Sequence, residues 1–134
     1  MAVIQDEQLP IRSSEDIVVI RKVIREWAIE SGFSLVEQTK LVTAASELAR
    51  NALQHGGGGE VRMQRLNDSD RRGVRIEFRD QGPGIADIPQ AMRDGFTTGG
   101  GLGLGLGGAR RLTNDFEIHS EPGQGTIVTI ARWK

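Results

Sequence analysis

The sequence contains no cysteine, which excludes a disulfide framework, thiolate chemistry and a cysteine-ligated zinc site. It has no excess of basic residues, since the formal net charge is −1, so nucleic-acid binding is not expected as its main role. The longest apolar runs fall far short of the roughly 18–20 residues of a membrane span. The N-terminal stretch Met1–Gln8 carries acidic residues and no apolar region typical of a signal peptide. Together these absences predict a cytoplasmic protein.

Glycine, in contrast, is abundant, with 18 among 134 residues, about twice the average usage of roughly 7%. Four form the run Gly56–Gly59 and seven lie in 99–108, where leucines alternate with them. A flexible linker would mix its glycines with serine and other polar residues. The leucines instead favour a loop that packs against the protein.

Periodicity and capping residues predict one domain, residues 1–134, with helices layered on a sheet. The expected elements begin with a strand at 3–12, a helix from Ser13 or Ser14 to about 30, and a helix from the capping box Ser34–Glu37 to about 54. Strands starting near 61 and 74 follow, with a turn at 67–73 between them. The chain continues with a short helix near 88–93, a helix from within 104–108 to 112, and a closing hairpin of 116–120 and 126–133. This order predicts an α+β fold, a two-layer sandwich whose mixed, largely antiparallel sheet is covered on one face by helices.

The first candidate motif is Glu47 followed by Asn51, which lie on one face of a helix because residues four apart project together. An amide oxygen suits Mg²⁺, which usually keeps water and phosphate as its other ligands. A neighbouring carboxylate can polarise a nucleophile or hold a metal-bound water. A solvated polar helix face is the alternative interpretation of this pair.

The second motif is Asp80-Gln-Gly82-Pro-Gly84, at the end of a predicted strand. Glycines let a ligand approach the backbone closely, and a carboxylate can accept a hydrogen bond from an amino group such as that of adenine. The alternative is an ordinary turn, because Asp, Gly and Pro are common turn residues.

The third motif is the glycine-rich run 99–108, which leads into a predicted helix and can present N–H groups to phosphate oxygens. No Gly-Lys-Ser/Thr follows, so it is not a Walker A loop. No strand leads directly into it, as a dinucleotide-binding fold requires. A flexible loop without a ligand is the alternative here.

The order of these motifs, closed by Gly-x-Gly-Thr before the last strand, is more specific than any one of them. Over residues 35–131 it resembles the GHKL ATPase superfamily, which implies the Bergerat ATP-binding fold. The stretches 46–51, 80–85, 95–98 and 100–106 look like the bacterial anti-sigma serine/threonine kinases, and the chain is most similar to RsbT-type switch kinases of the stressosome.

This resemblance implies a kinase that uses ATP and Mg²⁺ to phosphorylate a Ser or Thr of a STAS-domain partner. It also implies a second partner, a PP2C-type phosphatase activated by binding. Glu47 would act as general base, Arg50 would reach the γ-phosphate, and Asn51 with Glu47 would hold Mg²⁺. Asp80 would bind the adenine amino group, with Thr126 nearby. The residues expected around the nucleotide are Asn51, Asp80, Gly82, Gly84, Ile85, Thr98, Gly101, Leu102, Gly103, Leu104, Gly105 and Thr126.

Two other functions are compatible with the same motifs. One is the detached catalytic domain of a histidine kinase, against which the lack of a phosphoacceptor segment argues. The other is a non-catalytic ATP-dependent module that sequesters a sigma factor or switches a phosphatase, which an intact Glu47 makes less favourable. The two histidines are interpreted as surface residues: His55 at a helix end and His119 on a strand.

Overall fold

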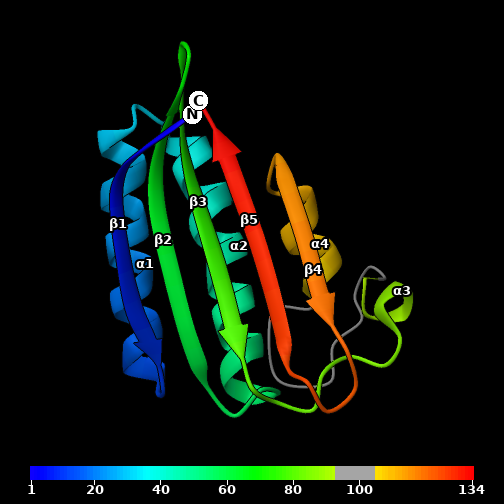
Figure 1. Ribbon diagram of the computed structural model, residues 1–134. Coiled ribbons are helices and arrows are strands. Elements are labelled where there is room, and N and C mark those ends of the chain that lie inside the picture. The colour runs from blue at the N-terminus through cyan, green and yellow to red at the C-terminus, as the bar shows by residue number, and fades with distance from the viewer. Residues whose placement is uncertain (93–104) are drawn as a thin grey trace.

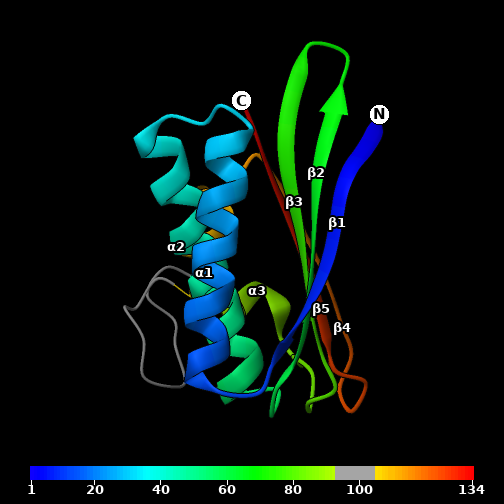
Figure 2. The same cartoon turned by 90° about the vertical axis from the view of Figure 1, so that its left-hand side faces the viewer.

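A computed structural model of the chain describes residues 1–92 and 105–134, which form two layers: a five-stranded sheet and helices packed on one of its faces (Figures 1 and 2). The elements in chain order are β1 (Ala2–Ile11), α1 (Ser14–Glu30), α2 (Leu35–Gln54), β2 (Gly59–Asp68), β3 (Arg71–Asp80), α3 (Ile88–Ala91), α4 (Gly105–Arg111), β4 (Asp115–Ser120) and β5 (Thr126–Trp133). The predicted two-layer α+β architecture is confirmed.

The strand order in the sheet is β1-β2-β3-β5-β4, and each neighbouring pair is antiparallel. Because β5 lies between β3 and β4, the end of β3, the start of β5 and the end of β4 meet at one end of the sheet. The C-terminal end of α2 lies behind that same end in Figure 1. The topology therefore brings together three segments that are distant in sequence.

Local sequence signals account for both long helices. Ser13 caps α1, where its side chain accepts a hydrogen bond from the Asp16 backbone N–H. The capping box predicted for α2 is present: the Glu37 N–H donates to Ser34 Oγ at 3.1 Å, and the Ser34 N–H donates to Glu37 Oε1 at 2.8 Å. The predicted apolar stripe of α1, including Ile20 and Ile24, is buried in the core.

The turn predicted at 67–73 is wrong. The β2–β3 ladder continues to the pair Asp68 and Arg71, which leaves a two-residue turn in which Ser69 has a φ of 56°. This tip of the hairpin extends past the helix layer in Figure 2. Its residues are largely exposed and polar because no helix covers them, so the apolar alternation that predicts a strand stops before the strands do.

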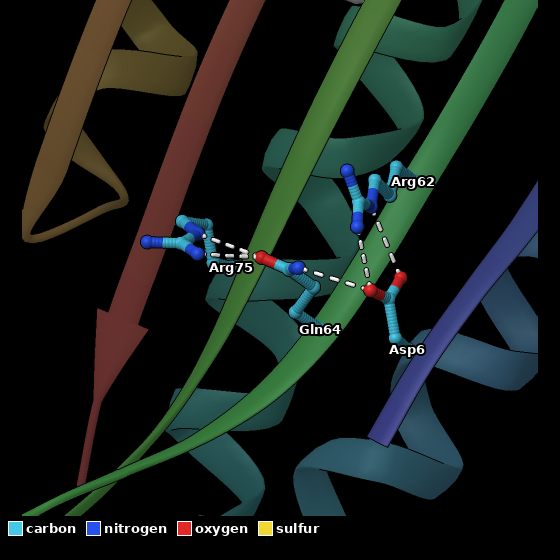
Figure 3. Close-up of polar contacts among 4 residues, drawn as sticks. All are labelled: Asp6, Arg62, Gln64 and Arg75. Atoms are coloured by element: carbon cyan, nitrogen blue, oxygen red, sulfur yellow. Dashed lines mark hydrogen bonds and ion pairs between the residues drawn. The ribbon is translucent and has the colours of Figure 1, made fainter. Parts of the chain in front are cut away.

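The sheet face away from the helices carries a network of polar side chains (Figure 3). Arg62 on β2 donates to both carboxylate oxygens of Asp6 on β1, at 3.1 and 2.7 Å. Gln64 donates to Asp6 at 3.1 Å and accepts from the Arg75 guanidinium at 2.6 and 3.0 Å. The hydrogen bonds from Arg62, followed by that from Gln64, lower the pKa of Asp6 from 3.8 to about 2.

This shift predicts a pH-dependent contribution of Asp6 to stability. Because the folded-state pKa is lower than the unfolded one, the contribution is fully present above about pH 4 and is lost as the pH falls towards about 2. The free energy of unfolding, measured by denaturant titration, should therefore be higher for the wild type than for Asp6→Asn at pH 6. The difference should shrink towards pH 2.5, and an unchanged difference would contradict the ion pair.

Candidate functional site

A cavity of about 350 Å³ lies at the end of the molecule where α2, β3 and β5 meet. Its lining residues are Leu48, Asn51, Ala52, His55, Gly56, Phe78, Asp80, Pro83, Gly84, Ile85, Ala91, Gly105, Leu106, Thr126 and Val128. Most of the wall is apolar, and Asp80 supplies a carboxylate to it. This combination of size, apolar lining and few polar groups is typical of a small-molecule site.

Three polar side chains form a row across the sheet at the cavity end. Asp80, the last residue of β3, is paired with Thr126, the first residue of β5. Thr126 is also paired with Ser120, the last residue of β4. Residues directly opposite each other in antiparallel strands point to the same face of the sheet. Asp80, Thr126 and Ser120 therefore all point to the helix-covered face.

Asp80 is held in place by glycines that approach it closely. The Gly82 N–H donates to Asp80 Oδ1 at 2.9 Å. A Cβ atom at Gly56 would lie 2.3 Å from Asp80 Cγ, and one at Gly125 would lie 2.3 Å from the Asp80 carbonyl oxygen. The glycines of this region therefore make room for a half-buried carboxylate that lines the cavity, which is more than an ordinary turn requires.

Glu47 is the one charged side chain that is buried among the described residues, at 4% exposure. Its Oε1 accepts a hydrogen bond at 3.3 Å from the N–H of Gly105, the first residue of α4. Asn51, one turn further along α2, lines the cavity itself. The pair is thus not a solvated helix face: Glu47 lies inside the protein beside the start of α4, and Asn51 faces the cavity.

The other predicted site residues divide into four groups. Gly84, Ile85 and Gly105 line the cavity together with the residues above, whereas Gly82 contributes through its bond to Asp80. Arg50 is half-buried and is not among the lining residues. Thr98, Gly101, Leu102, Gly103 and Leu104 lie outside the described residues.

Several lining residues are absent from the sequence-based prediction of the site, although spacing could have indicated some of them. Asn51, Ala52 and His55 follow Leu48 by three, four and seven residues. These helical spacings place all four on one face of α2. Phe78 and Val128 follow from strand alternation, two residues from Asp80 and Thr126. Ser120, which is not a lining residue, has no such local signal, since its hydroxyl accepts a hydrogen bond from Ile85, 35 residues away in the sequence.

In residues 1–92 and 105–134, no three His, Cys, Asp or Glu side chains are arranged to hold a metal ion. No helix within those ranges is both long and apolar enough to cross a membrane. His55 ends α2 and His119 lies on β4, both exposed as expected.

Comparison with known proteins identifies the class of domain to which this fold and cavity belong. Residues 36–134 match the family described as histidine kinase-, DNA gyrase B- and HSP90-like ATPase, and the chain belongs to this family. It is also 44% identical, over 118 residues, to the serine/threonine-protein kinase RsbT of Bacillus subtilis strain 168, covering 88% of this chain and 89% of that one. The chain therefore belongs to the RsbT-like serine/threonine-protein kinases.

More distant similarities are found among curated relatives and among solved structures. The anti-sigma F factor of Thermoanaerobacter sp. strain X514 is 28% identical over 117 residues, covering 84% of this chain and 82% of that one. The crystal structure of the RsbU and RsbW domains of Rv1364c from Mycobacterium tuberculosis superposes with a TM-score of 0.64 at 22% identity, covering 96% of this chain and 31% of that one. The SiaB-SiaC complex of Pseudomonas aeruginosa gives 0.54 at 13% identity, covering 98% and 91%. At these identities the two structures support the fold alone.

Proposed function

We propose that this protein transfers the γ-phosphoryl group of ATP to a serine or threonine of a STAS-domain partner, as one step of a cytoplasmic partner-switching pathway. The observation that carries the proposal is the likeness to a serine/threonine-protein kinase across almost the whole of both chains. The buried, intact Glu47 beside the cavity supports catalysis in addition to binding.

The cavity fits the base of an adenine nucleotide. Its apolar walls, which include Leu48, Phe78 and Val128, can enclose a flat ring. Asp80 Oδ1 accepts from the Gly82 N–H, which leaves Oδ2 to accept from the adenine amino group. Because a carboxylate only accepts hydrogen bonds, this end of the cavity favours a base that presents a donor.

The chemistry of the donor set also fits Mg²⁺ that arrives with the nucleotide. When bound, the ion neutralises charge that develops on the transferring phosphoryl group. Mg²⁺ is commonly held by one or two protein oxygens while phosphates and water complete its shell. Asn51, which lines the cavity, would supply its amide oxygen, and Glu47, one turn away on the same helix, would act on the ion through a metal-bound water.

Asn51→Ala tests this assignment. Nucleotide affinity measured with Mg²⁺ should fall by about tenfold or more, whereas affinity measured in EDTA should change much less, since the amide oxygen acts through the ion. Calorimetric titrations of the wild type and the variant, each with and without Mg²⁺, check the prediction. An equal loss under both conditions would mean that Asn51 does not hold the metal.

Glu47 and Arg50 are the residues to which we assign the phosphoryl-transfer step. A carboxylate next to the γ-phosphate can accept the proton of the attacking hydroxyl and orient it for in-line transfer. We assign this role to Glu47, which is held by the Gly105 N–H near the cavity. Arg50, half-buried on the same helix, would assist at the γ-phosphate.

A second candidate function is ATP-dependent binding without transfer, which the anti-sigma F factor relatives favour. Activation of a PP2C-type phosphatase by binding would also be of this kind. Incubation with radiolabelled ATP, Mg²⁺ and a purified STAS-domain protein distinguishes the two. We expect label on a Ser or Thr of the STAS protein. Stable complex formation without label would support the binding module instead.

A further inference from the structure

Ser120 ties together the two loops that close the base end of the cavity. Its Oγ accepts a hydrogen bond from the Ile85 N–H at 2.8 Å, donates to the Gly125 carbonyl at 3.0 Å and lies 2.8 Å from Thr126 Oγ1. Ile85 belongs to the loop after β3, and Gly125 and Thr126 belong to the β4–β5 hairpin. One hydroxyl thus links segments that are 35 and 6 residues away in sequence.

The directions of these bonds follow from counting protons. A serine hydroxyl has one proton to donate and two lone pairs that accept. The Gly125 carbonyl can only accept, so it takes the Ser120 proton, and the Ile85 N–H occupies one lone pair. The remaining contact, with Thr126, must then run from the Thr126 hydroxyl to Ser120.

Thr126 is therefore left as an acceptor. Its side chain lies on the same face of β5 as Val128, which lines the cavity as Thr126 does. With its proton committed to Ser120, Oγ1 can offer only lone pairs to a bound base. Asp80, directly opposite on β3, is likewise an acceptor.

We infer that Ser120 is a positioning residue. By accepting a hydrogen bond from the Thr126 hydroxyl, it leaves Thr126 Oγ1 as a hydrogen-bond acceptor and thereby selects adenine over guanine. Adenine presents a donor, its 6-amino group, where guanine presents an acceptor, its 6-oxygen. Two protein acceptors that face the 6-position of the base form hydrogen bonds with the amino group of adenine and repel the oxygen of guanine. This inference rests on the proposed binding of ATP in the cavity.

A purely structural role for Ser120 would have a different effect. If the hydroxyl only fixed the loop at Ile85, its loss would weaken ATP and GTP binding by the same factor. If the Ser120 hydroxyl instead fixes the direction of the Thr126 O–H, its loss frees the Thr126 hydroxyl to rotate and to donate to the 6-oxygen of guanine. The ratio of ATP to GTP affinity therefore separates the two roles.

The test is calorimetric titration of ATP and GTP into wild type, Ser120→Ala and Ser120→Thr. In Ser120→Ala the ATP affinity should fall by about three- to tenfold, the value of a neutral hydrogen bond. GTP affinity should stay the same or rise, so the preference for ATP shrinks by at least that factor. Ser120→Thr keeps the hydroxyl and should retain the wild-type preference.

Two further variants make the result specific. Ser34→Ala removes the cap of α2, 17 residues and about 25 Å before Asn51 along the helix, and should destabilise the fold with no change in preference. Thr126→Val should lose preference as Ser120→Ala does. In the double variant the two losses should not add, because Ser120 acts through Thr126.

An unchanged preference in Ser120→Ala, or additive losses in the double variant, would overturn the inference while leaving ATP binding intact. If Ser120→Ala does not fold, Thr126→Val alone decides, and an unchanged preference in that variant overturns it. Failure of the wild type to bind ATP would overturn the proposed function and this inference with it.

Discussion

Glu47→Gln should bind Mg-ATP with nearly wild-type affinity, still bind its protein partner, and transfer phosphate at least about a hundredfold more slowly. The side chain is buried, and its Oε1 accepts from the Gly105 N–H. Glutamine has the same shape and keeps an oxygen for that bond, but it cannot accept the proton of the attacking hydroxyl. The variant therefore removes the base and leaves the local structure intact.

Single-turnover transfer to the partner at saturating ATP is the measurement. Glu37→Gln is the matched control, because it changes a carboxylate at the other end of the same helix, in the capping box of α2. That control should lose some stability and no catalytic rate. A Glu47→Gln rate within threefold of wild type, roughly 0.6 kcal/mol in the barrier, would mean that Glu47 is not the base.

The second large effect is expected for Asp80→Asn, whose ATP affinity should fall by about 10- to 150-fold, or roughly 1.5–3 kcal/mol for a hydrogen bond to a charged group. Because the Gly82 N–H donates to Oδ1, the amide oxygen of asparagine will take that position. The amide NH₂ then replaces Oδ2 and directs a donor at the amino group of adenine, so the favourable bond becomes a repulsive contact.

Calorimetry with ATP checks this prediction, and Asp6→Asn serves as the control. Asp6 makes its hydrogen bonds on the open face of the sheet, with Arg62 and Gln64, so its change should leave ATP affinity unaltered. Thermal melting of both variants verifies that the fold is kept. Unchanged ATP affinity in Asp80→Asn would remove the base of the nucleotide from this cavity.

Features fixed by nearby residues could be predicted from the sequence. Ser13 and the pair Ser34 and Glu37 cap their helices through bonds within three residues, so the helix starts were predictable. The hairpin tip at Ser69 was not, because exposed strand residues carry no apolar pattern once no helix covers them. Periodicity reports burial, and it is uninformative where a strand extends into solvent.

The site shows the same division. The spacing of Glu47 and Asn51 on one helix, and the position of Asp80 at a strand end, follow from the sequence. The bond between Glu47 and the Gly105 N–H, and the links from Ser120, join residues far apart in the chain and depend on packing. The expected proximity of Arg50 to the phosphates stays a prediction.

The most direct test of kinase function is the identity of the residue that receives phosphate. Purified protein is incubated with γ-³²P-labelled ATP and Mg²⁺ in a lysate of the host, and the label on the acceptor protein is treated with acid. We predict acid-stable label on serine or threonine that is present with the wild type and nearly absent with Glu47→Gln. Acid-labile label on histidine, or no label with the wild type, would contradict the assignment as a serine/threonine kinase.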